Sequence, residues 1–173
     1  MIQVYVALGG NIGDSVAVLT RALQEISQIS GVFELKPSNF YRTTPVGATD
    51  QDDYVNAVCT FRTSLKIKEL HSTLQGIEEK LGKVPKLKDA PRVIDLDLLF
   101  YGTESYHEDN LQVPHPRWEE RMFVLTPLSD LVAELTVPDS SLPSGFRQVD
   151  LRERLRNFPN THNETVRLVK AHR

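Results

Sequence analysis

The 173-residue sequence is poor in residues that would place it in several specialised classes of protein. It has a single cysteine, Cys59, which excludes an intrachain disulfide framework and a cysteine-rich zinc site. The apolar alternation around Cys59 is typical of a small core residue. Hydrophobic residues make up 40% of the chain and charged residues 25%, so the composition is that of a globular domain.

Long apolar runs and an excess of basic residues are also missing. No uncharged stretch approaches the roughly 20 residues of a membrane-spanning helix. The N-terminus lacks the cationic start, apolar run and cleavage site of a secretory signal, so we expect a cytoplasmic protein without a membrane partner. The 20 Lys and Arg against 23 Asp and Glu give a net charge of −3, which argues against a nucleic-acid partner.

Hydrophobic periodicity predicts an α+β fold. Strands are expected at residues 2–8, 33–42, 53–63 and 93–101. One helix is expected from Asp14 or Ser15 to Gly31, and a second from a Ser64 cap to Gly82. The order β-α-β-β-α-β, followed by a C-terminal extension, is typical of a ferredoxin-like sandwich in which two helices cover one face of an antiparallel sheet.

The pattern indicates one domain over residues 1–159, followed by a loosely held polar tail over 160–173. No helix is evident to cover the second face of the sheet, and this is where we expect a site.

A glycine cluster, Gly9-Gly10-Asn11-Ile12-Gly13, lies between the first strand and the first helix. The position suggests a phosphate-binding loop, but the spacing matches neither common glycine-rich nucleotide motif. A tight turn with positive φ accounts for at least two of these glycines, so a structural role is favoured.

The strongest local signal is Asp95-x-Asp97 within an apolar strand. A spacing of two places both side chains on one face, with Cα atoms roughly 6.5–7 Å apart. Adjacent carboxylates repel one another and lose solvation, and a divalent cation relieves both costs. Carboxylate oxygens suit Mg²⁺, which keeps water and phosphate oxygens in its other positions. A solvated sheet face, or pairing with Arg92 and nearby lysines, is the alternative.

Cationic residues surround this pair in the sequence. Between Lys80 and Arg92 lie five basic residues and one acid, Asp89, which suits a clamp for a polyphosphate carried with Mg²⁺. A solvated surface loop explains the same charges. Farther along, prolines fix His115 in a loop that precedes Arg121, and this is a reasonable set of phosphate ligands.

Tyr54 and Asn56 share one face of their strand. The tyrosine offers a flat apolar wall, and the fixed donor and acceptor of the amide suit the edge of a heterocycle.

Taken together, these blocks resemble the 6-hydroxymethyl-7,8-dihydropterin pyrophosphokinase family of folate biosynthesis. The similarity runs from the first strand to about Pro138 and includes residues 40–47, 54–57, 91–99, 113–116 and 121–128. The resemblance implies the ferredoxin-like α+β sandwich and transfer of the β,γ-pyrophosphoryl group of ATP to the hydroxymethyl oxygen of the pterin, with release of AMP. It further implies a monomer that acts on small molecules.

The resemblance also implies roles for individual residues. Asp95 and Asp97 would hold two Mg²⁺ ions, with Asp95 also near the attacking hydroxyl, and Lys83 and Arg92 fall where the family places catalytic-loop cations. The positions that correspond to nucleotide binding are Gln75, Glu78, Leu98, His115 and Arg121. Those of the pterin pocket are Thr43, Pro45, Val46, Tyr54, Asn56, Asp95 and Phe123, where Asn56 reads the ring edge and Phe123 stacks on the ring.

The sequence departs from the family pattern in the basic loop. The family usually has Arg at Lys83, another Arg near Pro85, and Arg-Trp-Gly where this chain has Lys88-Asp89-Ala90. Lysine lacks the two-pronged grip of arginine on phosphate, and the missing Trp removes an apolar seal, so we expect retained chemistry with weaker loop closure. Asn110 stands where Arg can occur, which weakens the case for one nucleotide contact.

Two other functions fit parts of the pattern. A nucleotidyltransferase also joins a small-residue turn to an Asp-x-Asp strand, but there the two elements are close in sequence, whereas Gly9 and Asp95 are far apart. A ferredoxin-like RNA-binding module would stack bases on its sheet. The net charge and the two acids on the expected binding face argue against it.

Overall fold

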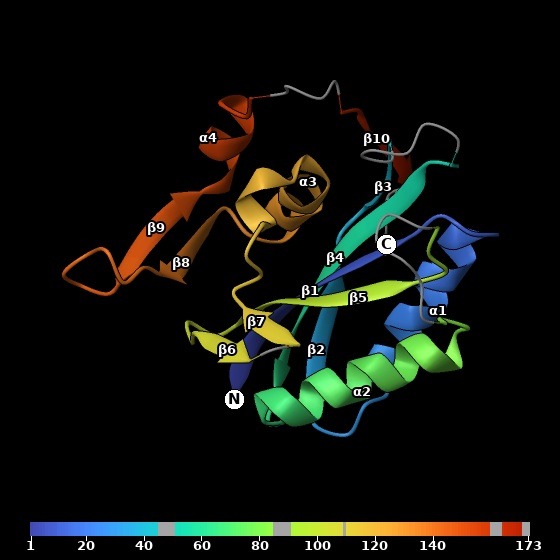
Figure 1. Ribbon diagram of the computed structural model, residues 1–173, viewed down its shortest axis with the longest axis horizontal. Coiled ribbons are helices and arrows are strands. Elements are labelled where there is room, and N and C mark those ends of the chain that lie inside the picture. The colour runs from blue at the N-terminus through green and yellow to red at the C-terminus, as the bar shows by residue number, and fades with distance from the viewer. Residues whose placement is uncertain (45–50, 85–90, 109, 160–163, 171–173) are drawn as a thin grey trace.

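The computed structural model describes residues 1–44, 51–84, 91–108, 110–159 and 164–170. Its centre is a six-stranded antiparallel sheet, with strand order β10-β3-β4-β1-β5 and with β2 paired to β4 (Figure 1). The strands are β1 (Ile2–Gly10), β2 (Val32–Pro37), β3 (Phe40–Thr43), β4 (Tyr54–Thr63), β5 (Asp95–Tyr101) and β10 (Val166–Lys170). The mixed α/β class with an antiparallel sheet is therefore confirmed.

Helices α1 (Ser15–Ser27) and α2 (Ile67–Lys80) cover one face of the sheet (Figure 1). Their buried side chains, among them Leu19, Ile26 and Leu74, pack with Val4 and Val6 of β1 in the larger apolar cluster. The 3.6-residue spacing of these apolar positions explains why both segments form helices that bury a single stripe.

A third helix packs on the second face of the sheet, and the hydrophobic periodicity of the sequence did not predict it. Helix α3 (Met122–Leu131) follows a short 3-10 turn, η1 (Trp118–Glu120), and its buried residues Leu125 and Leu128 pack on Val58 and Phe100. The expectation of an uncovered face is therefore wrong over this part of the sheet. The remaining elements are β6 (Tyr106–Glu108), β7 (Leu111–Val113), β8 (Glu134–Pro138), β9 (Phe146–Asp150) and α4 (Leu151–Arg156).

Three local expectations differ from the structure. The extended segment 33–42 is divided into β2 and β3 at Ser38, whose backbone N–H and hydroxyl both bond to the backbone of Val58. Helix α1 ends at Ser27, before Gly31. Helix α2 is capped at Lys66, because Ser64 lies in the preceding turn and donates its N–H to the Gly31 carbonyl.

The C-terminal residues 166–170 are also ordered differently from the expected loose tail. They form β10, which pairs with β3 at the edge of the sheet, Val166 opposite Thr43 and Leu168 opposite Tyr41. The division of the chain at residue 159 into a domain and a tail stays a prediction. Within the described residues, no helix is long and apolar enough to cross a membrane.

Candidate active site

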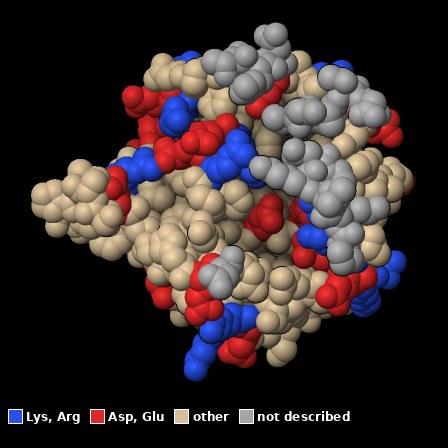
Figure 2. All heavy atoms as spheres, viewed as in Figure 1, with Lys and Arg blue, Asp and Glu red and all other residues tan. Residues whose placement is uncertain are grey.

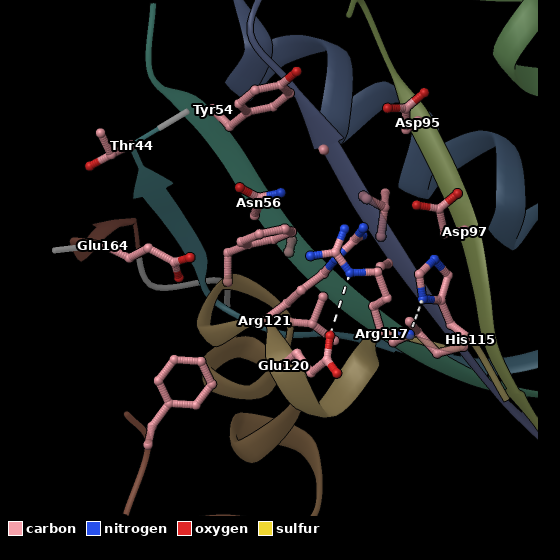
Figure 3. A pocket seen from close by; sticks show the side chains of 18 of the residues that line it. Thr44, Tyr54, Asn56, Asp95, Asp97, His115, Arg117, Glu120, Arg121 and Glu164 are labelled. Atoms are coloured by element: carbon pink, nitrogen blue, oxygen red, sulfur yellow. Dashed lines mark hydrogen bonds and ion pairs between the residues drawn. The ribbon is translucent and has the colours of Figure 1, made fainter. Parts of the chain in front are cut away.

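A pocket of about 540 Å³ opens on the α3 side of the sheet, where Phe123 and Val124 of the first turn of that helix line it. Its lining comes from β1, β4, β5, the segment around η1, and the C-terminal part of the chain (Figure 3). Figure 2 shows acidic side chains in the centre of this face, with basic side chains close by. The sheet face on which we expected a site therefore carries the pocket.

Two carboxylates, Asp95 and Asp97, mark one end of the pocket (Figure 3). Both project from β5 on the same face, and they lie opposite Gly9 and Ala7 of β1. Loss of water among the pocket walls, followed by repulsion from Asp95 and Glu78, raises the pKa of Asp97 to about 6. This end of the pocket therefore disfavours the ionised form of Asp97.

Lys83 supplies part of the compensation. Its Nζ lies 2.8 Å from Asp95 Oδ1 and 2.9 Å from Oε2 of the buried Glu78. Desolvation lowers the pKa of Lys83, but its bonds to Asp95 and Glu78 outweigh that effect and raise the pKa above its ordinary value. Glu78 also accepts the backbone N–H of Leu96 at 2.7 Å, so one carboxylate ties α2 to β5 beneath the acidic pair.

A neutral histidine and two arginines line the middle of the pocket. Burial, reinforced by the charges of Arg121 and Arg117, lowers the pKa of His115 to about 4. Its Nδ1 accepts the Arg117 backbone N–H at 3.2 Å, which places the remaining proton on Nε2. His115 therefore acts as a neutral hydrogen-bond donor near neutral pH.

An amide and two aromatic rings also line the pocket. They belong to Asn56, Tyr54 and Phe123. Figure 3 shows Tyr54 and Asn56 across the pocket from Asp97. Thr43 Oγ1 donates to Asn56 Oδ1 at 2.6 Å, and Asn56 Nδ2 lies directly above Gly9, where a Cβ would come within 2.7 Å. The threonine thus fixes the amide with its donor group over β1.

Not all the predicted residues lie in this pocket. Eight of them line it: Arg92, Asp95, Asp97, His115, Arg121, Tyr54, Asn56 and Phe123. Thr43 and Lys83 do not line the pocket, but they contact the lining residues Asn56 and Asp95. Gln75 is exposed on α2, Leu98 is buried in the larger apolar cluster, and Glu78 supports β5. Their nucleotide-binding roles stay predictions. Pro45 and Val46 fall outside the described residues, as do Pro85 and Lys88-Asp89-Ala90.

Asn11 is a supporting residue that the sequence analysis missed. Its buried side chain accepts the backbone N–H of Arg92 at 2.8 Å and donates to Gln51 Oε1 and the Asp52 carbonyl, both at 3.0 Å. A Cβ on the adjacent Gly10 would lie 2.3 Å from the Val93 carbonyl oxygen. The glycine cluster therefore lets the chain before β5 approach β1 closely. The presence of one polar residue, Asn11, in this cluster was the sequence signal that could have identified its supporting role.

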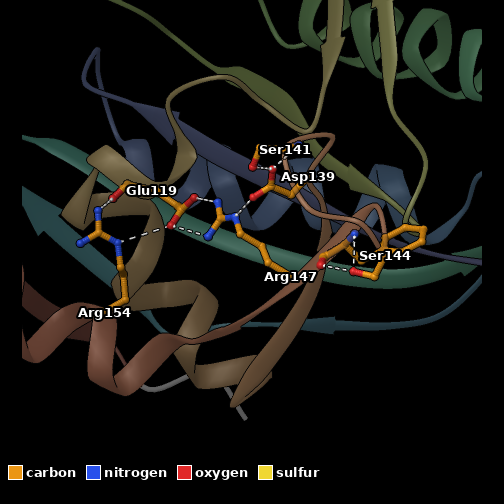
Figure 4. Close-up of polar contacts among 7 residues, drawn as sticks. Glu119, Asp139, Ser141, Ser144, Arg147 and Arg154 are labelled. Atoms are coloured by element: carbon orange, nitrogen blue, oxygen red, sulfur yellow. Dashed lines mark hydrogen bonds and ion pairs between the residues drawn. The ribbon is translucent and has the colours of Figure 1, made fainter.

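An ionic cluster near the pocket joins η1 to the C-terminal elements (Figure 4). Glu119 pairs with both Arg147 of β9 and Arg154 of α4, and Arg147 also lies 3.3 Å from Asp139. Arg154 itself lines the pocket, together with Phe158, Pro159 and Glu164. These C-terminal wall residues were not predicted from the sequence.

No group of three or more His, Cys, Asp or Glu side chains is placed to hold a metal within the described ranges. The pair Asp95 and Asp97 nevertheless fits Mg²⁺, because this ion is commonly held by one or two carboxylates and completes its shell with water and substrate phosphate. A bound cation would offset both the lost hydration and the repulsion that raise the pKa of Asp97.

The chain is similar to known proteins over most of its length. Residues 5–133 match the family model of 7,8-dihydro-6-hydroxymethylpterin-pyrophosphokinase. A 2-amino-4-hydroxy-6-hydroxymethyldihydropteridine pyrophosphokinase of Haemophilus influenzae is 39% identical over 82% of this chain and 89% of its own length. The Bacillus subtilis protein with the same name is 40% identical over 76% of this chain and 78% of its own length.

A solved structure has a related fold. A Plasmodium falciparum HPPK–DHPS chain matches 90% of this chain with a TM-score of 0.66 and 12% identity, and this chain spans only 42% of that longer protein. At 12% identity, the match shows only that the two folds are related. The family match and the two bacterial relatives establish that the chain belongs to the 7,8-dihydro-6-hydroxymethylpterin-pyrophosphokinase family.

Proposed function

We propose that the protein transfers pyrophosphate from ATP to 6-hydroxymethyl-7,8-dihydropterin, in a Mg²⁺-dependent reaction of folate biosynthesis that releases AMP. Membership of the family makes the chain a pyrophosphokinase, an ATP-dependent diphosphotransferase. One observation carries the assignment of substrates. A single pocket has a paired-carboxylate end suited to metal and phosphate, and an amide-and-aromatic side suited to a flat heterocycle.

Asp95 and Asp97 would hold the metal, and we propose two Mg²⁺ ions at this pair. Bound Mg²⁺ supplies neutralisation of the charge on the transferring phosphates. Asp95 would also lie near the attacking hydroxyl. Lys83 holds Asp95 by an ion pair and so orients its carboxylate.

The remaining protein groups position the triphosphate, since phosphoryl transfer requires mainly alignment and electrostatic stabilisation from the enzyme. Arg92 and Arg121 line the pocket and supply positive charge. Neutral His115 donates one hydrogen bond from Nε2 to a phosphate oxygen, so it orients the chain of phosphates without adding charge.

On the other side, Asn56 Nδ2 would donate to the edge of the pterin, because its Oδ1 is already engaged by Thr43. Phe123 and Tyr54 would enclose the ring faces. The Arg121 guanidinium lies 5.6 Å from the centre of the Phe123 ring, which links the phosphate-binding and ring-binding groups at the centre of the pocket.

Two finer structural points belong to the same proposal. The strand order β5-β1-β4-β2, with α1 and α2 on one face, supports a ferredoxin-like core to which β3 and β10 add an edge. We propose a cytoplasmic monomer whose partners are the two small substrates.

The test is incubation of the full chain with ATP, Mg²⁺ and 6-hydroxymethyl-7,8-dihydropterin, with the adenine product identified by chromatography. AMP and the diphosphorylated pterin are expected, and release of pyrophosphate would point to nucleotidyl transfer instead.

Asp95→Ala is expected to reduce turnover by several orders of magnitude with an unchanged circular dichroism spectrum. Asn56→Ala is expected mainly to weaken pterin binding, and calorimetry with an unchanged pterin Kd would contradict that assignment.

A further inference from the structure

Lys83 binds two acids of the candidate active site with a single ammonium group. Its Nζ lies 2.8 Å from Asp95 Oδ1 and 2.9 Å from Glu78 Oε2. Glu78 is buried, and its Oε2 also accepts the Leu96 backbone N–H at 2.7 Å, so it is fixed to the strand that carries Asp95. Lys83 therefore already pairs with one of the two proposed metal ligands.

The chain turns sharply to bring Lys83 to this position. Gly82 follows the last residues of α2 with a φ of +103°, a conformation that glycine adopts readily. The Lys83 backbone N–H then donates to the Glu78 carbonyl at 3.0 Å. The backbone and the side chain of Lys83 thus both bond to Glu78, and the ammonium group is a fixed part of the site with 29% of the side chain exposed.

Lys83 also acts on the second aspartate, Asp97, which projects from β5 on the same face as Asp95 (Figure 3). Loss of water among the pocket walls, followed by repulsion from neighbouring acids, raises the pKa of Asp97 to about 6, and the charge of Lys83 acts against this rise. A divalent cation at the paired aspartates would stabilise the same ionised groups. The two cations would also repel each other, so both cannot hold Asp95 equally well.

We infer that Lys83 is a resident counter-ion of the metal site, and that its ammonium group competes with a divalent cation for the Asp95 carboxylate. The inference rests on the proposed function, because it takes the paired aspartates as the metal ligands. Lysine suits this role, since it binds as a compact point charge on a flexible stem, whereas the planar fork of arginine grips a carboxylate with two bonds. When a metal takes Asp95, Lys83 keeps Glu78 as a partner, so its charge stays paired.

This competition makes metal binding depend on the nucleotide. Mg²⁺ held by one or two carboxylates completes its shell with water and substrate phosphates. With Lys83 in place, the acids alone attract a divalent cation weakly, and the phosphates of ATP supply the further ligands and negative charge that make its binding favourable. Lys83 thus favours binding of the metal together with ATP over binding of the metal alone.

The test is a titration of the full chain with Mn²⁺ in the absence of nucleotide, followed by electron paramagnetic resonance. Mn²⁺ prefers the same carboxylate and water ligands as Mg²⁺. Lys83→Met removes the charge and keeps a long unbranched side chain, so Mn²⁺ affinity is expected to rise about 10-fold. A larger rise is not expected, because the Lys83 and Asp95 side chains are 29% and 30% exposed and solvent screens their charges.

Two further variants separate the local charge from other effects. Lys83→Arg keeps the charge, so its Mn²⁺ affinity should not exceed that of the wild type. Lys80→Met is the matched control, because Lys80 ends α2 and pairs with Glu25 of α1 at 2.8 Å. It removes the same charge from the protein without touching Asp95 or Glu78, and its Mn²⁺ affinity should equal that of the wild type.

Thermal unfolding of the same chains gives a second readout. In EDTA, Lys83→Met should unfold at a lower temperature than the wild type, because Asp95 and the buried Glu78 lose their counter-ion. Saturating Mn²⁺ should raise the unfolding temperature of Lys83→Met by more, since tighter binding to the folded state stabilises it more. A merely structural lysine would leave the two increments equal. If Lys83→Met is unfolded in EDTA, refolding on addition of Mn²⁺ supports the inference, and failure to refold contradicts it.

Equal Mn²⁺ affinity in the wild type and Lys83→Met would overturn the inference, as would a rise in Lys83→Arg as large as that in Lys83→Met. If the wild type at the same time converts ATP to AMP with the pterin, the proposed function stands and the inference alone fails. A chain that binds no Mn²⁺ with either residue at position 83, and forms no AMP, would contradict both.

Discussion

Asp97 combines a functional position with a cost to stability. Its carboxylate faces Asp95 and stands near Glu78, and its pKa is raised to about 6 from an ordinary value of 3.8. The folded state therefore binds the proton more tightly than the unfolded state does. For a carboxyl group shifted in this direction, the ionised form penalises folding at neutral pH, and the penalty disappears as pH falls through the folded pKa towards 3.8.

Asp97→Asn is therefore expected to stabilise the fold while it removes activity. The free energy of unfolding should rise by about 1 kcal/mol at pH 7.5. This is less than the pKa shift alone would give, because the side chain faces the open pocket and solvent screens its charge. It should shrink at pH 5, where the wild-type carboxyl is largely protonated. Urea unfolding at both pH values measures the difference, and turnover should fall at least about 100-fold. A variant less stable than wild type at pH 7.5 would contradict the electrostatic account.

Gly10 and Gly76 differ in whether the structure has room for a side chain. At Gly10 a Cβ would lie 2.3 Å from the backbone oxygen of Val93, whereas at Gly76 on α2 there is open space. Gly10→Ala is expected to lower the free energy of unfolding by about 2 kcal/mol or more, because the backbone before β5 must move. Gly76→Ala should raise it by about 0.5–1 kcal/mol. Chemical denaturation compares the two, and a tolerated Gly10→Ala would show that β1 and the 92–93 segment can separate freely.

The junction of elements at Asn11 is as important as the strands that it joins. One side chain bonds Arg92 ahead of β5, and it also bonds Gln51 and Asp52 ahead of β4. Asn11→Ala leaves the part-buried Arg92 N–H without this acceptor, and we expect a loss of about 1–3 kcal/mol. The Michaelis constant for ATP should rise, because Arg92 lines the pocket. Asn157→Ala, at the exposed end of α4, is the control and should stay within about 0.5 kcal/mol of wild type.

The sheet core and the paired-carboxylate end of the pocket were predictable from local pattern. Short apolar runs identified β1 and β5, and alternation identified β4. The two-residue spacing of Asp95 and Asp97 placed both on one face before any partner was known. These features depend only on the 2.0 and 3.6 residue periods, which a single segment reveals. The helix interiors followed for the same reason.

Features that depend on distant partners were not predictable. Ser64 is a better capping residue than Lys66, yet its N–H bonds to Gly31 in a turn that the sequence does not announce. The segment 166–170 is short, and its pairing with β3 joins residues far apart in the chain. Thr43 supports Asn56 through a hydrogen bond, and no local pattern distinguishes such support from direct contact with substrate.

At the scale of the whole molecule, the pocket depends on two apolar clusters and on an ionic joint. One cluster lies under α1 and α2, and the other joins α3 to the β8–β9 hairpin and α4. The C-terminal wall is anchored to η1 through Glu119, whose carboxylate pairs with Arg147 and Arg154 (Figure 4). The wall residue Arg154 therefore depends on a carboxylate outside the pocket.

Glu119→Gln tests this dependence. Its carboxylate is only 22% exposed, so removing its charge leaves two partly buried arginines with Asp139 as the remaining acid in the cluster. The expected loss is about 1–2 kcal/mol of unfolding free energy at low salt, and it should diminish in 1 M NaCl, where screening weakens the native pairs. Glu120→Gln is the control, because Glu120 pairs with Arg117 between side chains that are 66% and 57% exposed, and its stability should change by less than about 0.5 kcal/mol. Since Arg154 lines the pocket, Glu119→Gln should also raise the Michaelis constant of a substrate. Equal stability of the two variants at low salt would mean that the apolar cluster alone holds the C-terminal wall in place.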